Sequence, residues 1–144
     1  LLSSDTMSNL HEIEFCGTID DPLMHPRFLD IVDTIYKYRP NISITLHTNG
    51  SLRNEEFFAE LATSLRRFDH HQINWSIDGA SQETNVMYRQ KTDFDKILKN
   101  AKAFIDAGGK SVWQFLIFPF VSIPIFLSKQ LFTESDSLKK STLL

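Results

Sequence analysis

The chain has 144 residues, of which 42% are hydrophobic and 23% charged, with a formal net charge of -3. This composition is ordinary for one soluble globular domain that can bury a core, and it offers no basic surface for nucleic acid. The single cysteine, Cys16, excludes an internal disulfide, and no apolar run reaches the roughly 18 residues of a membrane span. We therefore expect a cytoplasmic protein with no nucleic-acid and no membrane partner.

The first half of the chain predicts two strands with a helix between them. Polar and apolar residues alternate over 12–16 and stop at Gly17, as in a short strand that ends in a turn. A helix is expected to open at Pro26, because proline fits the first helical turn, and to end before Pro40. The next strand is expected over 42–46.

The same alternation of helix and strand continues along the chain. Asn54 is suited to cap a second helix, and a third strand is expected over 72–77. Apolar residues at helical spacing over 94–105 predict a third helix, with Gly108 as its C-terminal stop. A fourth strand is expected over 112–118.

This β-α-β-α-β-α-β order predicts an α/β fold with a parallel sheet built from right-handed crossovers. The pattern alone does not separate part of a barrel from an open, doubly wound sheet. No GxGxxG follows the first strand and no P-loop occurs, so neither nucleotide-binding motif supports the open sheet. We assign residues 1–118 to this domain and residues 119–144 to an irregular tail, which is interrupted by proline and then rich in Ser, Thr and Lys.

Ligands of parallel βα folds bind at the carboxyl ends of the strands. In this chain each predicted strand end carries small or polar residues, and any one of them is explained by turn chemistry. Their joint occurrence predicts one shared pocket. The residues are Gly17, Thr18, Asp20 and Asp21 after the first strand, Thr48, Asn49 and Gly50 after the second, Ser76, Asp78 and Gly79 after the third, and Gln114 in the fourth.

Four of these segments, in chain order, resemble the motifs of radical S-adenosylmethionine (SAM) enzymes. Residues 17–26 resemble the GGEP-type motif of that family, and the segments Thr48-Asn49-Gly50, Ser76-Ile77-Asp78-Gly79 and Tyr88-Arg89 resemble its later motifs. The resemblance implies part of a TIM-like barrel, truncated at both ends. It also implies a parent enzyme that cleaves SAM reductively to a 5′-deoxyadenosyl radical with a [4Fe–4S] cluster, for peptide or cofactor modification.

The resemblance also implies a role for each site residue. Gly17, Asp21 and Pro22 belong to the loop that binds the amino group of SAM, Ser76 contacts the ribose, and Arg89 binds the carboxylate. Asn49 and Asp78 line the same mouth, and Gln114 adds a polar contact. The charges suit a zwitterion, since guanidinium can bind a carboxylate bidentately. Asp20 departs from the family pattern, which has glycine there.

The cluster-binding loop of the family, CxxxCxxC, is absent. Cys16 alone cannot hold a cluster, and we expect it to be a buried thiol at a strand end. The cluster is therefore expected only in a full-length parent, and no catalytic or metal-binding residue is predicted in this chain. Two alternatives remain. The first is a non-catalytic partial barrel that retains some affinity for SAM or a nucleotide, or that has only a packing role. The second is a metal-independent α/β binding protein in which the polar residues at the strand ends merely form turns.

Overall fold

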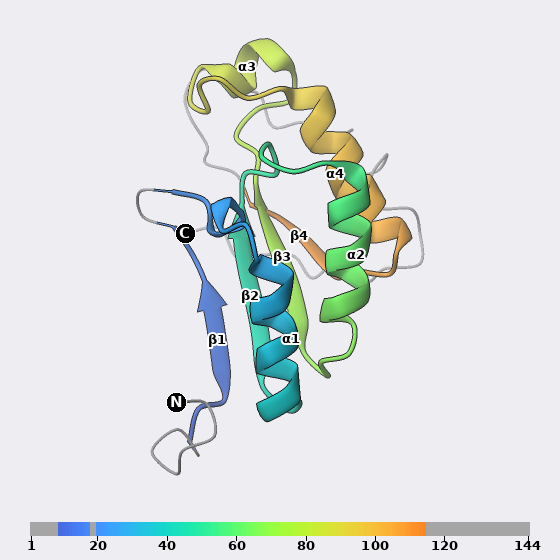
Figure 1. Cartoon of the computed structure of the whole chain (residues 1–144). Helices are drawn as coiled ribbons and strands as arrows, with labels where there is room; N and C mark the ends of the chain where they lie inside the picture. Colours follow the sequence, from blue (N-terminus) through green and yellow to red (C-terminus); the bar gives the residue numbers. More distant parts are fainter. Residues whose placement is uncertain (1–8, 18–19, 115–144) are drawn as a thin grey trace.

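A computed structural model describes residues 9–17 and 20–114 of the chain. Its centre is one parallel sheet of four strands in the order β1-β2-β3-β4, so each strand pairs with the next one along the chain (Figure 1). This confirms the predicted α/β class. The strands are β1 (Glu12–Phe15), β2 (Ser43–Thr48), β3 (His71–Ser76) and β4 (Ser111–Gln114).

Three long helices cover the same face of this sheet (Figure 1). Right-handed crossovers that always step to the next strand in one direction place every connecting helix on one side. The helices are α1 (Phe28–Tyr38), α2 (Glu55–Leu65) and α4 (Phe94–Asp106), and two short helices precede α1 and α4, namely η2 (Pro22–Met24) and α3 (Gln82–Val86). None of the helices over 9–17 and 20–114 is both long and apolar enough to cross a membrane.

The core lies between the sheet and the three long helices. Alternate residues of the two central strands face the helices, so Leu46 and Ile73 are completely buried. Trp75 is the largest core side chain, with its ring 5.1 Å from that of Phe58 on α2 and 6.0 Å from that of Phe104 on α4. These contacts join β3 to both helices, and burial of the apolar side chains stabilises the two-layer arrangement.

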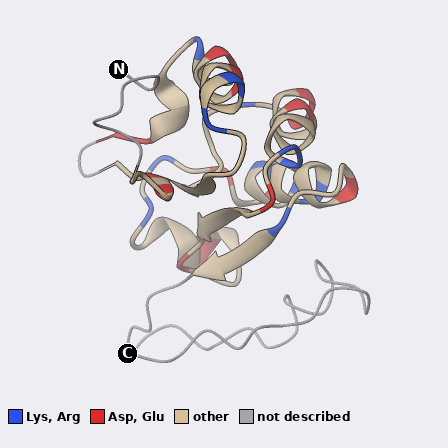
Figure 2. Cartoon of the chain, turned by 90° about the horizontal axis from the view of Figure 1, so that it is seen from below, with Lys and Arg blue, Asp and Glu red and all other residues tan. Residues whose placement is uncertain are grey.

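Acidic and basic positions both occur on α1 and α4, and Figure 2 shows them spread over the helical layer. Arg67, which follows α2, pairs with Asp33 of α1 and lies 4.5 Å from the ring centre of Tyr36. Such exposed contacts add little to stability individually.

Two predicted helix ends are confirmed and one helix start is wrong. The Asn54 side chain accepts a hydrogen bond from the backbone of α2 at 3.1 Å, and Gly108 follows α4 with a φ of +84°. However, α1 begins at Phe28, and Pro26 lies in the turn before it. The reason is that Asp21 caps a separate short helix, η2, before the chain turns into α1.

Three further differences concern a helix, a strand end and Cys16. Helix α3 was not predicted, because five residues are too few to show a helical period. The fourth strand, expected over 112–118, is described as β4 as far as Gln114. The rest of that predicted strand and the proposed boundary after 118 lie outside the described residues. Cys16 is exposed rather than buried, because it follows an edge strand and continues the alternation of Glu12 and Glu14 on the face without helices.

Candidate functional site

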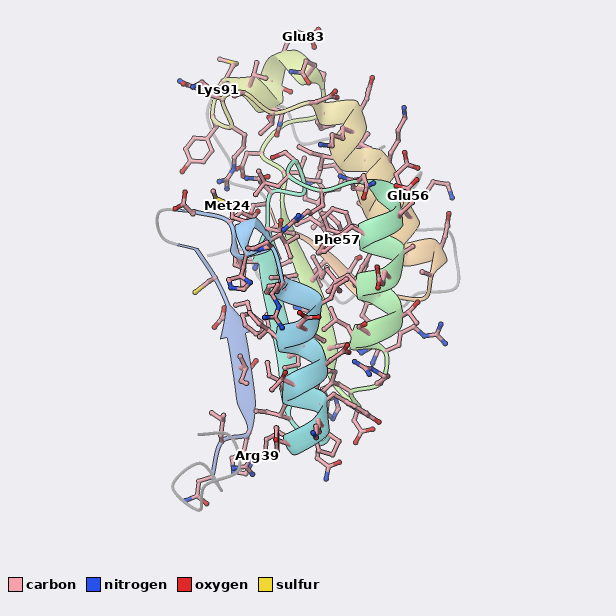
Figure 3. The ribbon with its side chains drawn as sticks, viewed as in Figure 1. Met24, Arg39, Glu56, Phe57, Glu83 and Lys91 are labelled. Carbon is pink, nitrogen blue, oxygen red and sulfur yellow. The ribbon has the colours of Figure 1, made fainter. Side chains whose placement is uncertain are left out.

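The predicted site residues lie at the edge of the sheet where all four strands end. Met24 and, beyond it, Lys91 lie at this end of the molecule, whereas Arg39 lies at the opposite end (Figure 3). Parallel pairing is what brings the four strand ends together. The site residues come from the loop after β1 (Gly17, Asp21 and Pro22), the loop after β2 (Asn49), the end of β3 and the segment that follows it (Ser76, Asp78 and Arg89), and the end of β4 (Gln114).

Asp21 ties the loop after β1 to the end of β2. Its Oδ1 accepts a hydrogen bond from the backbone of Leu23 at 2.9 Å. Its Oδ2 accepts one from Thr48 Oγ1 at 2.6 Å and one from the backbone of Asn49 at 3.0 Å. A carboxylate has about four acceptor positions, so these contacts leave one for a cation. The sequence did not reveal that Thr48, which is only 4% exposed, holds this acid.

The loop that begins with Gly17 needs glycine at that position. A Cβ on Gly17 would lie 1.4 Å from the carbonyl oxygen of Asp20, so the backbone approaches itself too closely for any side chain. Pro22 follows at the first position of η2, where its missing N–H costs nothing. Asp20, which stands where the family has glycine, is exposed and directs only its backbone carbonyl toward Gly17.

The loop after β2 is held by its own side chains and by Arg53. Asn49 Oδ1 accepts hydrogen bonds from the backbone and the hydroxyl of Ser51. Arg53 donates to the carbonyl oxygens of Leu23 and His25 at 2.8 and 2.9 Å. The side-chain amide nitrogen of Asn49 makes no hydrogen bond to a described residue, and it remains a donor for a ligand.

Asp78 and Arg89 form an ion pair beyond the end of β3. The Asp78 side chain is 1% exposed, and its Oδ2 lies 2.6 Å from Arg89 Nε. Of the Arg89 side-chain nitrogens, only Nε bonds to a described residue, which leaves both Nη groups for a ligand. The Arg89 side chain is 31% exposed. Asp78 therefore orients the Arg89 side chain, and a buried ion pair of this kind is costly to break from one side.

Helix α3 supports this ion pair through Asn85, a residue that the sequence analysis did not single out. Asn85 is fully buried, and its Oδ1 accepts a hydrogen bond from the backbone of Asp78 at 3.2 Å. Its own carbonyl accepts one from the backbone of Arg89 at 2.8 Å. A Cβ on Gly79 would lie 2.2 Å from the backbone nitrogen of Asn85, so this close approach requires glycine.

Ser76 and Gln114 lie side by side at the ends of β3 and β4. They are paired in the register of the two strands, on the face without helices. The Ser76 hydroxyl makes no hydrogen bond to a described residue, and Gln114 is exposed. Both polar side chains therefore lie at the strand ends on the face without helices.

The charged groups fit the amino-acid end of SAM. Asp21 lies in the loop after β1 and Arg89 in the segment after α3, and the two side chains carry opposite charges. The ammonium and the carboxylate of a zwitterion can each form a charge-assisted hydrogen bond with one of them. A [4Fe–4S] cluster does not fit, because the chain has one cysteine and the described residues hold no group of three metal-binding side chains.

Comparison with known proteins bears on the fold and on the family. No curated protein sequence matches the chain. The fold is similar to anSMEcpe with bound AdoMet (20% identity, TM-score 0.55, 73% of this chain and 28% of that chain) and to native anSMEcpe with bound AdoMet and Cp18Cys peptide (20% identity, TM-score 0.56, 73% of this chain and 30% of that chain).

The present chain therefore spans less than a third of the length of those solved structures. At this identity the likeness shows a shared fold, which is that of the predicted partial barrel with a sheet that is open over the described residues. The sequence pattern of the radical SAM superfamily matches residues 11–121. Because this match covers most of the chain, the protein belongs to the radical SAM superfamily.

Proposed function

We propose that this chain binds SAM at the carboxyl ends of β1 to β4 and is the SAM-holding part of a radical SAM enzyme. Asp21 accepts the ammonium group and the Nη groups of Arg89 donate to the carboxylate. Ser76 contacts the ribose. Gly17 and Pro22 shape the loop under the amino group, and Asn49 and Gln114 add polar contacts.

The observation that carries this proposal is that the two opposite charges are held in place before any ligand binds. Asp21 is fixed by its hydrogen bonds to Leu23, Thr48 and Asn49, and Arg89 by the buried Asp78. Side chains that are already ordered lose little conformational entropy on binding. A site of this kind suits a small zwitterion better than two unconstrained surface charges would.

The chemistry of the complete enzyme would be reductive cleavage of SAM beside a [4Fe–4S] cluster, for the modification of a peptide or a cofactor. The cluster ligands would have to come from residues other than these, since Cys16 is the only cysteine. The residues of this chain would orient SAM and exclude competing poses.

Calorimetric titration of the 144-residue chain with SAM tests the proposal. Arg89→Ala should weaken binding by about tenfold or more, because it removes charge-assisted hydrogen bonds. Ser76→Ala should weaken it by a few-fold, as expected for one neutral hydrogen bond. Arg27→Ala is the matched control, because Arg27 pairs with Asp30 on the exposed surface of the helical layer. Absence of measurable binding by the wild type, or equal affinities of the Arg89 and Arg27 variants, would contradict the proposal.

A second candidate function is a non-catalytic partial barrel that binds SAM without cleaving it. The single cysteine favours it for the chain taken by itself. Sequencing the gene beyond the ends of this chain separates the two roles. A CxxxCxxC motif in the same open reading frame would favour the enzyme, whereas an open reading frame without such a motif would favour the non-catalytic role.

A further inference from the structure

The loop between β2 and α2 is held by two side chains of helix α4. Asn100 Nδ2 donates hydrogen bonds to the carbonyl oxygens of Gly50 at 2.8 Å and Arg53 at 3.0 Å. Lys96, one turn earlier on α4, donates through Nζ to the carbonyl oxygen of Ser51 at 2.7 Å. One helix thus binds three backbone carbonyls of this loop, which leads into α2 beside α4 (Figure 1).

The Asn100 side chain is unusual for the buried face of a helix. It is fully buried, and its Oδ1 has no hydrogen-bond partner among the described residues. Burial of an amide oxygen without a partner is costly, so a role in packing alone would be better met by an apolar side chain. What asparagine adds at this position is its pair of hydrogen bonds to the loop.

Two chains of hydrogen bonds connect this loop to Asp21. In the first, the Gly50 backbone donates to Thr48 Oγ1 at 3.0 Å, and the Thr48 hydroxyl donates to Asp21 Oδ2 at 2.6 Å. In the second, the Arg53 guanidinium donates to the Leu23 carbonyl at 2.8 Å, and the Leu23 backbone donates to Asp21 Oδ1 at 2.9 Å. Both chains begin at a residue whose carbonyl is bound from α4, and each ends on a different oxygen of the same carboxylate.

The loop is also packed closely against the core at Gly50. Its φ is +73°, and a Cβ there would lie 2.8 Å from the Trp75 ring and 3.3 Å from Ile97 Cγ2 on α4. Because the interior is close-packed, a shift of this loop relative to α4 is transmitted to its neighbours. The position of α4 is therefore coupled to the end of β2.

We propose that Asn100 is a positioning residue for the SAM site. Together with Lys96 it holds the loop after β2, and through that loop it keeps Asp21 directed at the ammonium group of SAM. Arg89 is held separately, through Asp78 and helix α3. The two charges of the site therefore depend on different helices. This inference rests on the proposed function, because it takes Asp21 as the acceptor of the ammonium group.

Calorimetric titration with two analogues of SAM tests the inference. The deaminated analogue lacks the ammonium group and reports on Asp21, and the decarboxylated analogue reports on Arg89. Wild type should prefer SAM to each analogue by about tenfold, as for one charge-assisted contact. Asn100→Ala should lower the preference over the deaminated analogue to about threefold or less and retain the preference over the decarboxylated one. A general loss of stability would instead weaken both preferences alike.

A second variant perturbs the fold less. Lys96 is only partly buried, and Lys96→Met keeps the aliphatic stem but removes the hydrogen bond to Ser51. It should lower the preference over the deaminated analogue by about threefold. Lys99→Met is the matched control, because it makes the same substitution at an exposed position of α4, and it should retain both preferences.

The two proposals fail in different ways. If wild type shows both preferences and the variants of Asn100 and Lys96 keep the preference over the deaminated analogue, the positioning inference is overturned and the SAM site stands. The same holds if these variants lose both preferences together, or if Lys96→Met and Lys99→Met behave alike. If wild type does not bind SAM, or binds SAM and the deaminated analogue equally, the proposed function fails and this inference fails with it.

Discussion

The loop that carries Asp21 should be one of the main determinants of stability at the carboxyl edge of the sheet. Asp21→Ala would remove the acceptor of three hydrogen bonds, from the Leu23 backbone, the Thr48 hydroxyl and the Asn49 backbone. It would also leave the Thr48 hydroxyl, which is 4% exposed, without its acceptor.

The size of the effect follows from these contacts. Hydrogen bonds to charged groups contribute about 1.5–3 kcal/mol each, but three bonds to one carboxylate in a partly exposed loop are not additive. We expect a loss of about 3 kcal/mol in the free energy of unfolding. With a urea m value of about 2 kcal/mol/M, the unfolding midpoint should fall by roughly 1.5 M.

Urea unfolding can be followed by tryptophan fluorescence, because Trp75 is 2% exposed in the folded chain. Asp20→Ala is the matched control, since Asp20 is the exposed neighbour and should change stability by less than about 0.5 kcal/mol. Equal midpoints for the two variants would refute the view that Asp21 joins β1 to β2.

Two further predictions concern His71 and Gly79. Burial lowers the pKa of His71 below its usual value of 6.5, so the folded chain binds this proton less readily than the unfolded chain. Stability should therefore be fully present above about pH 6.5 and decline as the pH falls below it, and His71→Gln should reduce the slope of the urea midpoint against pH. Gly79→Ala should cost about 1–3 kcal/mol through overpacking against Asn85, and calorimetry should show weaker SAM binding because Arg89 is displaced.

Each of these two predictions has a result that would contradict it. A midpoint slope that is the same in His71→Gln and in wild type would mean that the buried imidazole does not contribute to the pH dependence. A Gly79→Ala variant with wild-type stability and wild-type SAM affinity would mean that α3 moves away without affecting Arg89.

Local patterns in the sequence were sufficient for the strands, the long helices and several helix ends. The periods of apolar residues identify β2, β3 and α4, and a cap such as Asn54 acts within its own turn. The start of α1 was predicted wrongly because Asp21 and Pro22 form a separate short helix first. Cys16 was expected to be buried, but exposure at a sheet edge depends on which strands lie beside it, and local pattern does not carry that information.

The candidate site was likewise predictable only in part from the sequence. Parallel strands had to bring Asp21, Ser76 and Gln114 to one edge, and this followed from element order alone. The sequence did not reveal the residues that hold these charges in place. Thr48 is distant from Asp21 in the sequence, and Asn85 lies on α3, a helix too short to predict. Asp78 was expected to line the mouth of the site, but the structure shows it buried against Arg89.

The most direct test of the account compares SAM with its decarboxylated analogue, titrated calorimetrically into wild type and Arg89→Ala. If Arg89 binds the ligand carboxylate, wild type should prefer SAM by about tenfold or more, and Arg89→Ala should bind the two ligands with nearly equal affinity. A preference for SAM that is undiminished in Arg89→Ala would contradict the account, because the carboxylate would then be bound elsewhere.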